Sequence, residues 1–259
     1  MNRKDLEKFI KESLYEDIKD GDHTSKATIN TKVNKKAILI AKDTGVIAGV
    51  DQSSQGYWLS LSTHAQKPYV VIVLNYRDFS LKNEEKESRG ILVKLLSGLS
   101  SKEEATRLHT EIMNNYSPHS ILIADHTDAY INSNQSSQAK FIGPGVSSFS
   151  NGLPESVWPK QKKLSNILEN EVKKLKSQDQ IIEKCFDALR NNEQFPIEQL
   201  PNTYTGEPME KLLSSIFIKS TAYGTRSSYV LILSETHVHL AEINYDSNGK
   251  IIDRSDFKK

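Results

Sequence analysis

Residues 69–77 read Tyr69-Val-Val-Ile-Val-Leu-Asn-Tyr-Arg77, an aliphatic run that ends in an amide and a guanidinium. β-Branched residues favour strands, and a run without polar alternation is typical of a strand buried on both faces. The pattern continues towards the amino terminus. Residues 37–42 and 46–50, separated by Asp43-Thr-Gly45, predict a hairpin, and residues 57–62 predict the next strand. The amino-terminal third is therefore predicted to be rich in sheet.

Helices and further strands follow this sheet. Apolar residues at three- and four-residue steps predict helices over residues 91–99, 102–114, 160–176 and 179–190, and an amphipathic helix near the amino terminus over residues 6–18. Strands are predicted at 121–125, 129–132, 216–219, 229–234 and 237–244, before a closing turn at 246–249. Strands, then helices, then strands again indicate an α+β protein with helices packed on stacked antiparallel sheets.

Two local signals refine this prediction. Ser101 is followed three residues later by Glu104, the spacing of a capping box, so the second predicted helix is expected to begin there. Residues 143–159 are dense in Gly, Pro and Ser and predict a long ordered loop. Loops of this length inside a domain are often functional.

Composition excludes several classes of protein. The chain carries 34 Lys+Arg against 33 Asp+Glu, so its net charge of +1 does not favour nucleic acid as a partner. No apolar run approaches the roughly 20 residues that span a bilayer, and the charged start predicts a cytoplasmic protein. The single cysteine, Cys185, lies in an apolar helical pattern and is expected to pack in a core.

Several short motifs from residue 56 onwards occur in a recognisable order. They are Gly56-Tyr-Trp-Leu59, Leu74-Asn-Tyr-Arg77, Ser88-Arg-Gly90, Phe149-Ser-Asn-Gly-Leu153, Trp158-Pro-Lys160 and Tyr223-Gly-Thr-Arg-Ser-Ser228. In this order they resemble the Asn-Arg-Asp-Glu (NRDE) family, which includes transport and Golgi organization protein 2. The resemblance covers residues 47–259 approximately and implies a domain over 51–259. It also implies the αββα four-layer sandwich of amino-terminal-nucleophile (Ntn) hydrolases.

That family resemblance implies a nucleophile that this sequence lacks. In Ntn hydrolases the side chain of the first residue attacks a carbonyl while its free α-amine accepts the proton. The NRDE family places a cysteine after the initiator methionine, whereas position 2 here is Asn and methionine is expected to stay in front of it. Lys42-Asp43 echoes the family's Arg-Asp pair, but chance similarity between two aliphatic strands is the better interpretation.

The other half of the implied site is present. Asn75 and Asn151 match family positions whose amides point at a developing oxyanion, and Arg226 matches an arginine beside the nucleophile. Each also has a structural interpretation, which for any one residue is favoured. Asn75 ends a strand, Asn151 caps a turn, and Arg226 anchors a loop through a salt bridge. Their joint occurrence in family order predicts a shared pocket.

Five other residues are weaker candidates for binding: Arg77, Arg89, Asp125, Trp158 and Tyr223. Arg89 opens a predicted helix and could hold an anionic group there, although an arginine in that position usually lies in solvent. Trp158, next to Pro159, is most simply a packing anchor for the long loop.

Residues 1–50 carry a second resemblance. Glu16-Asp-Ile18, Gly21-Asp-His-Thr-Ser25 and Gly45-Val-Ile-Ala-Gly49 resemble the amino terminus of quinolinate phosphoribosyltransferase, also called nicotinate-nucleotide pyrophosphorylase. The resemblance does not imply that activity, because no series of alternating strands and helices follows that would form the family's barrel. We expect a helix plus a hairpin, not an independent domain.

No metal or cofactor is expected. Asp20-Gly-Asp-His23 lacks a second ligand cluster, so a solvated turn is favoured. His237 and His239 lie two residues apart on one predicted strand face, but no third ligand has diagnostic spacing.

Three hypotheses follow. The first is a divergent NRDE-family protein that has lost its nucleophile and binds a small amphipathic molecule, haem or an acyl lipid, as the family resemblance suggests. The second is an amidohydrolase acting on C–N bonds, whose nucleophile is exposed by processing at Thr24 or Ser25. The third is a chimera, natural, erroneous or artificial, in which a phosphoribosyltransferase fragment without activity completes the sheet.

Overall fold

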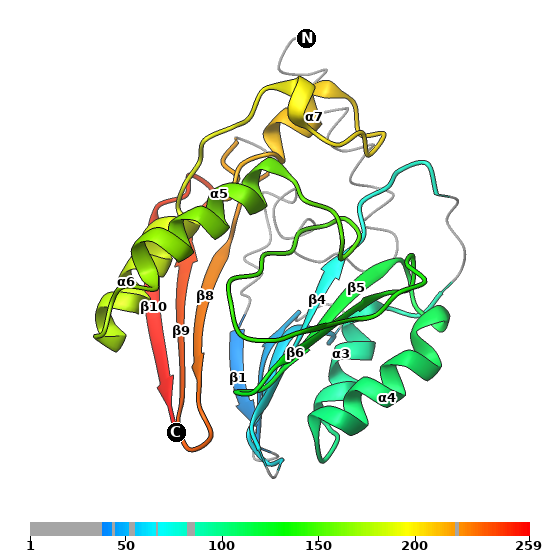
Figure 1. Ribbon diagram of the computed structural model, residues 1–259, viewed down its shortest axis with the longest axis vertical. Helices are drawn as coiled ribbons and strands as arrows, with labels where there is room; N and C mark the ends of the chain where they lie inside the picture. Colours follow the sequence, from blue (N-terminus) through cyan, green and yellow to red (C-terminus); the bar gives the residue numbers. More distant parts are fainter. Residues whose placement is uncertain (1–37, 43–44, 52–54, 66, 82–85, 221–222) are drawn as a thin grey trace.

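The computed structural model describes residues 38–42, 45–51, 55–65, 67–81, 86–220 and 223–259 (Figure 1). The helix predicted over 6–18 and the Asp20–His23 turn lie outside these residues, as do the proposed processing sites.

Seven strands form one antiparallel sheet in which each strand pairs with the next along the chain. They are β1 (Ile38–Lys42), β2 (Val46–Val50), β3 (Tyr57–Ser62), β4 (Tyr69–Asn75), β5 (His119–Ala124), β6 (Ala129–Ser133) and β7 (Lys140–Ile142). The predicted β1–β2 hairpin is confirmed, with Ile38 opposite Val50 and Lys42 opposite Val46. Val70 and Val71 are both buried although they point to opposite faces, as predicted for this strand. The short strand β7 was not predicted.

A second antiparallel sheet has three strands in the order β10-β9-β8. They are β8 (Ser227–Leu233), β9 (Val238–Tyr245) and β10 (Ile251–Lys258). The prediction of a strand at 216–219 was wrong, because this segment makes only an isolated bridge between Lys219 and Gly224. The prediction that the chain closes at the 246–249 turn was also wrong. The polar residues of β10 hide its alternation, and only pairing with β9 makes it a strand.

Four predicted helices are confirmed with shifted ends: α3 (Arg89–Ser97), α4 (Lys102–Ile112), α5 (Pro159–Ile167) and α6 (Gln178–Leu189). Helix α7 (Glu207–Leu212) was not predicted. The structure also has 3-10 turns at Met113–Asn115 and Ile197–Gln199 and a π turn at Leu168–Val172. Ser101 caps α4 by accepting from the backbone N–H of Glu104, as predicted. The Glu104 carboxylate, however, accepts from the N–H and hydroxyl of Ser100, so the capping box is incomplete.

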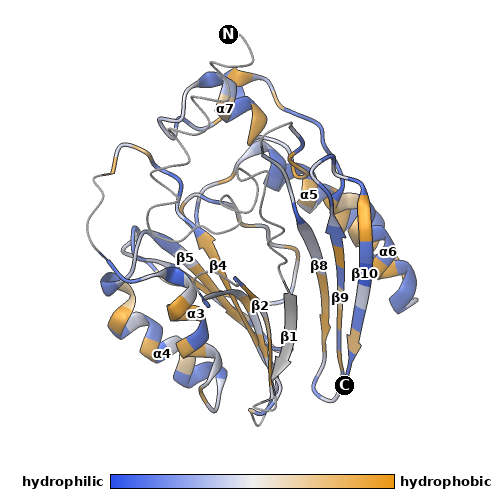
Figure 2. Ribbon diagram, turned by 180° about the vertical axis from the view of Figure 1, so that it is seen from behind, coloured by the Kyte–Doolittle hydropathy of each residue, from blue (hydrophilic) through white to orange (hydrophobic). Residues whose placement is uncertain are grey.

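The elements stack in four layers, helix, sheet, sheet, helix (Figure 1). Helix α3 packs on the seven-stranded sheet and α6 on the three-stranded sheet. The inner faces of the sheets meet through Ile47 and Leu61 on one side and Val238 and Leu240 on the other. Hydrophobic residues are concentrated in the strands of both sheets (Figure 2). The predicted α+β class is confirmed, and the specific kinship to Ntn hydrolases stays a proposal.

The Trp58 side chain lies against Gly49 of the neighbouring strand β2. A β-bulge shifts the β2–β3 register between Gly49 and Val50 and leaves Trp58 unpaired. A Cβ on Gly49 would lie 2.4 Å from the Trp58 ring, so only glycine leaves room for the indole. The indole lies close enough to the Tyr229 hydroxyl on the opposite sheet to act on its pKa, which burial and the Glu242 charge raise and Trp58 lowers. Tyr229 donates to the buried Glu242 carboxylate on the neighbouring strand at 2.5 Å.

A fully buried histidine pair lies between α4 and β5. The Nε2 atoms of His109 and His119 are 3.1 Å apart, and His119 Nδ1 donates to the carbonyl oxygen of Ser117 at 2.8 Å. With its proton on Nδ1, neutral His119 accepts at Nε2, so His109 must donate from its own Nε2. Burial lowers the pKa of His109 to about 3 and that of His119 to about 4. Both rings are therefore neutral near pH 7, and a second proton would break the pair.

The pair predicts loss of stability in weak acid. An unfolded histidine has a pKa of about 6.5, so below that pH the unfolded chain binds protons that the folded chain excludes. The free energy of unfolding should fall by about 1.4 kcal/mol per pH unit for each histidine as the pH drops from 6.5 towards 4. Urea unfolding at pH 7, 6 and 5 measures this slope.

The matched variants are His109→Gln with His119→Gln, and His237→Gln alone. The double variant should be less stable at pH 7 but should lose less stability between pH 7 and pH 5. His237 is exposed, so its replacement should leave the slope unchanged. Equal slopes in the wild type and the double variant would show that the buried pair does not control acid stability.

Candidate functional site

The predicted pocket residues Asn75 and Asn151 meet where β4 ends. Asn151 Nδ2 donates to the carbonyl oxygen of Asn75 at 3.0 Å, and the backbone N–H of Arg77 donates to the carbonyl oxygen of Asn151 at 2.7 Å. The long loop is thus fastened to the end of β4 at both contacts. This places the two motifs side by side and gives the Asn151 amide a structural role, while its oxyanion role stays a prediction.

Arg77 forms a buried ion pair beside this contact. Its Nη2 lies 3.1 Å from Glu210 Oε2, with side chains 9% and 5% exposed. The second carboxylate oxygen, Oε1, accepts from the N–H and the hydroxyl of Thr203 at 2.6 and 2.5 Å. A buried ion pair offsets its desolvation only when its remaining hydrogen-bonding positions are also filled. The carboxylate therefore meets that condition and fixes the guanidinium in place.

Trp158 forms one wall of this cluster. The Arg77 guanidinium lies 4.6 Å from the centre of the buried Trp158 ring, and the Lys160 amine lies 5.6 Å from it. Two cations thus approach one aromatic ring, an arrangement that a ring quadrupole stabilises. Pro159 follows at the first position of α5, where a missing N–H costs nothing, and Gln161 accepts from the Trp158 N–H. The predicted packing role of Trp158 is confirmed.

Lys160 is the most perturbed group near the site. Its amine donates to the carbonyl oxygen of Leu213 at 3.1 Å. Its pKa is lowered to about 7, mainly by burial and also by the Arg77 charge, while the Glu210 carboxylate opposes both effects. A lysine with such a pKa is partly neutral under physiological conditions and can exchange a proton there.

Arg226 and Tyr223 lie near the start of β8, and Tyr223 exchanges hydrogen bonds with Ser220. Arg226 precedes β8, and its carbonyl oxygen accepts from the Tyr245 N–H at 2.8 Å. Backbone N–H groups lower the pKa of the nearby Asp246, and the Arg226 charge adds to this effect. The start of β8 and the end of β4 lie at the same end of the two sheets (Figure 1). Within the described residues, no hydrogen bond or ion pair joins Arg226 to Asn75 or Asn151, so their shared pocket stays a prediction.

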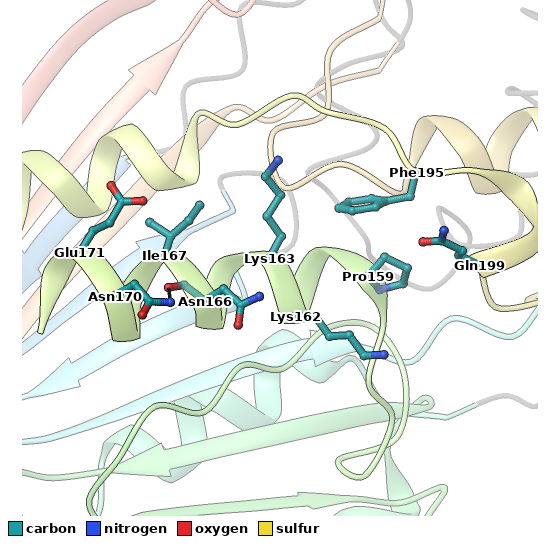
Figure 3. Close-up of a pocket in the computed structure, with 9 residues that line it drawn as sticks. All are labelled: Pro159, Lys162, Lys163, Asn166, Ile167, Asn170, Glu171, Phe195 and Gln199. Carbon is teal, nitrogen blue, oxygen red and sulfur yellow. Dashed lines mark hydrogen bonds between the residues drawn. The ribbon is translucent and has the colours of Figure 1, made fainter.

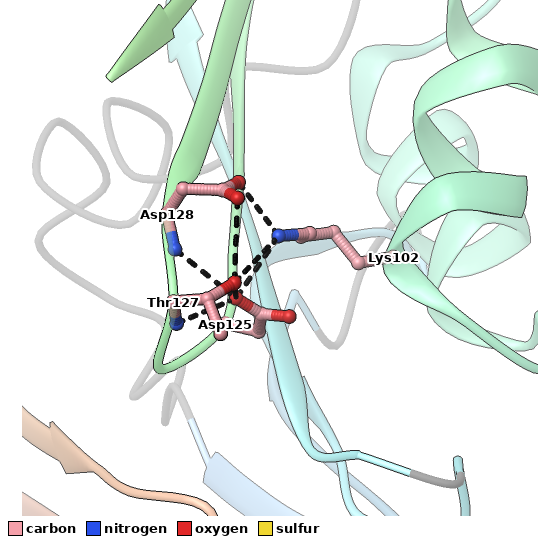
Figure 4. Close-up of polar contacts among 4 residues, drawn as sticks. All are labelled: Lys102, Asp125, Thr127 and Asp128. Atoms are coloured by element: carbon pink, nitrogen blue, oxygen red, sulfur yellow. Dashed lines mark hydrogen bonds and ion pairs between the residues drawn. The ribbon is translucent and has the colours of Figure 1, made fainter. Parts of the chain in front are cut away.

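Asp125 belongs to a separate polar cluster at the β5–β6 turn (Figure 4). Lys102 Nζ lies 2.9 Å from Asp125 and 2.6 Å from Asp128, and Thr127 donates to Asp125 through both its N–H and its hydroxyl. Burial alone would raise the pKa of Asp125, but these hydrogen bonds outweigh it and hold the pKa well below the usual range. The cluster fastens α4 to the turn.

The expectation that Arg89 lies in solvent was wrong. Arg89 is the first residue of α3 and is buried, and its Nη1 donates to the carbonyl oxygen of Pro118 at 3.2 Å. The two histidines that raised the question of zinc also have ordinary partners. His239 Nε2 lies 2.6 Å from Asp256, and His237 is exposed beside Thr236.

A groove of about 440 Å³ runs along α5, which begins at Pro159 (Figure 3). Its lining combines apolar side chains, two lysines and several amides: Pro159, Lys162, Lys163, Asn166, Ile167, Asn170, Glu171, Phe195 and Gln199. One wall lies on the helix predicted over residues 160–176. The opposite wall, with Phe195 and Gln199, lies on the proline-containing connector, which carries no motif, so only the folded chain reveals it.

A model of the family described as transport and Golgi organisation 2 matches residues 30–247. The chain belongs to this family. No curated protein matched the sequence. The family match includes β1 and β2 and so overlaps residues 30–50, part of the segment for which a resemblance to a phosphoribosyltransferase was predicted. The boundary near residue 50 therefore stays a prediction.

The single cysteine of this transport and Golgi organisation 2 family chain, Cys185, lacks the environment of a nucleophilic cysteine. Cys185 is half-buried on α6 and packs against the core cluster between that helix and the three-stranded sheet. Burial raises the pKa of its thiol, and nucleophilic cysteines need the reverse.

The position of Lys160 predicts a measurable titration. The ¹³C resonance of its ε-carbon should titrate near pH 7, well apart from the other lysines. Glu210→Gln should lower this pKa, because the carboxylate that favours the charged amine is gone. Glu207→Gln, an exposed change at the start of the same helix, should leave it unaltered. A Lys160 titration above pH 10 in the wild type would contradict the assigned environment.

Proposed function

We propose that this member of the transport and Golgi organisation 2 family binds a small amphipathic, anionic molecule of the acyl-lipid class. The α5 groove is the site, and it carries the proposal because it joins an apolar floor to a basic rim. Pro159, Ile167 and Phe195 supply the apolar surface, and Lys162 and Lys163 supply the charge.

The size and stiffness of the groove support a ligand role. A volume of about 440 Å³ lies within the usual range for small-molecule sites. Both walls are fastened to one short segment: Lys160 of α5 donates to Leu213, and the Phe195 N–H on the connector donates to Ser214 Oγ at 3.0 Å. A preformed groove loses little conformational entropy when a ligand enters.

The energetics fit a short acyl chain. Each buried methylene contributes about 0.8 kcal/mol, and micromolar binding requires about 8 kcal/mol. A chain of roughly ten methylenes, partly offset by the entropy of association, reaches this range when lysines also hold an anionic head group. Lys162 is exposed and accessible to such a head group. Lys163 is ion-paired with Glu193 at the opposite wall and can exchange that partner for the ligand.

An acyl lipid fits the groove better than haem. Haem iron is usually held by His, Cys, Met or Tyr, and none of the nine residues that line the groove is of these types. The same residues include no Ser, Thr or Cys, so they offer no hydroxyl or thiol nucleophile for hydrolysis. These observations support binding rather than cleavage. The helix–sheet–sheet–helix order of layers supports descent from an Ntn-hydrolase sandwich as part of the same proposal.

Calorimetric titration with decanoyl-coenzyme A tests the proposal. We expect saturable binding that Lys162→Glu weakens about tenfold, equivalent to about 1.4 kcal/mol, because the change places an acid against the anionic head group. Ile167→Glu should abolish binding by introducing a charge into the apolar floor.

Lys174→Glu is the matched control, since this exposed lysine lies after the π turn and does not line the groove. Its affinity should equal that of the wild type at the same ionic strength. Absence of saturable binding, or equal affinity in all three variants, would remove the acyl-lipid proposal. Saturable haem binding with no response to decanoyl-coenzyme A would favour the other ligand class.

A further inference from the structure

Strand β10 forms an edge of the three-stranded sheet, and within the described chain it pairs only with β9. It is eight residues long and contains no proline. Seven of its eight residues are exposed. A long edge strand presents unpaired backbone N–H and C=O groups that can pair with another chain. We propose that a second copy of this chain pairs with β10, antiparallel, about a two-fold axis at Ser255.

The β9–β10 hydrogen bonds determine which residues face outward. Val238 and Lys259 exchange both backbone hydrogen bonds, at 2.8 and 2.9 Å. Hydrogen-bonded and non-hydrogen-bonded pairs alternate along an antiparallel ladder, so Ser255 and Phe257 also direct their N–H and C=O groups towards β9. Arg254, Asp256 and Lys258 therefore direct theirs into the sheet plane on the free side, and an incoming strand pairs with these residues.

Charge selects the register. With Ser255 opposite Ser255 of the second copy, each Arg254 lies opposite an Asp256, and the two pairs form four backbone hydrogen bonds. Opposite charges on facing residues stabilise a sheet, and like charges destabilise it. A shift of two residues one way places Arg254 opposite Arg254. A shift of two the other way places Asp256 opposite Asp256 and Arg254 opposite Lys258. Only the central register of these three pairs opposite charges throughout.

The side chains are already positioned for these contacts. Arg254 and Asp256 lie on the same face of β10, where Arg254 Nε approaches Asp256 Oδ2 at 3.2 Å and Arg254 Nη1 approaches Glu183 at 2.5 Å. His239 holds the other oxygen of Asp256 at 2.6 Å. These contacts restrict the rotamers of both residues before association, which lowers its entropic cost. The new strand would also cover Ile252, which is 64% exposed at the end of the edge.

Sedimentation velocity of the full chain tests the proposal. The expected species has twice the monomer mass of 29.2 kDa. Arg254→Asp places two acids opposite each other and should weaken the dimer at least tenfold. The double change of Arg254→Asp with Asp256→Arg restores opposite charges and should restore the dimer. Glu183→Gln removes the Arg254 partner on α6 without altering the edge, and the dimer should persist.

A cross-link tests the register separately. In a Cys185→Ser background, Ser255→Cys should give a disulfide-linked dimer on mild oxidation, because facing residues in a non-hydrogen-bonded pair have Cα atoms about 4.5 Å apart. Asp253→Cys should not cross-link, since in this register its counterpart lies beyond the roughly 7 Å limit for Cα atoms in a disulfide. Circular dichroism confirms that each variant folds. A wild-type monomer at 100 µM or more, or a dimer that is indifferent to both charge changes, overturns the proposal.

Discussion

The structure depends on the contact between the inner faces of two antiparallel sheets. Ile47 and Leu61 on one sheet and Val238 and Leu240 on the other exclude water there, with side chains no more than 3% exposed. The three-stranded sheet has apolar residues on both faces, so this contact covers one face and the α6 contact covers the other. The packing also fixes how the ends of β4 and β8 lie relative to each other, and so sets the geometry of the candidate site.

Buried charges impose a second constraint. Arg77 with Glu210 and Lys102 with Asp125 each include both signs, and hydroxyl or backbone donors fill the remaining positions on the carboxylates. Removing one member of such a pair leaves an uncompensated charge and costs several kcal/mol. Lys160 differs because its hydrogen-bond acceptor is a carbonyl oxygen and the Arg77 charge acts on it. Its pKa is therefore lowered to about 7, so the amine is partly neutral near pH 7, whereas an exposed lysine is charged there.

Sequence patterns predicted part of the candidate site. Asn75, Arg77, Asn151 and Trp158 were selected from motif order, and the folded chain brings them together through the loop that ends at α5. Glu210, which completes the cluster, belongs to no motif and lies 133 residues from Arg77 in the chain. Nothing local distinguishes it from the other glutamates. The α5 groove could not be predicted either, because one of its walls is a connector whose sequence has no hydrophobic periodicity.

The sequence by itself determined most of the elements, because hydrophobic period, capping and turn residues act over a few positions. It identified the strands from β1 to β6 and the helices that cover them, and it indicated the transport and Golgi organisation 2 family. Tertiary structure alone decided that residues 251–258 form a strand, that His109 and His119 share a hydrogen bond, and that Arg89 is buried. These outcomes depend on partners distant in the chain, since a polar or charged group can be buried only where folding supplies its counterpart.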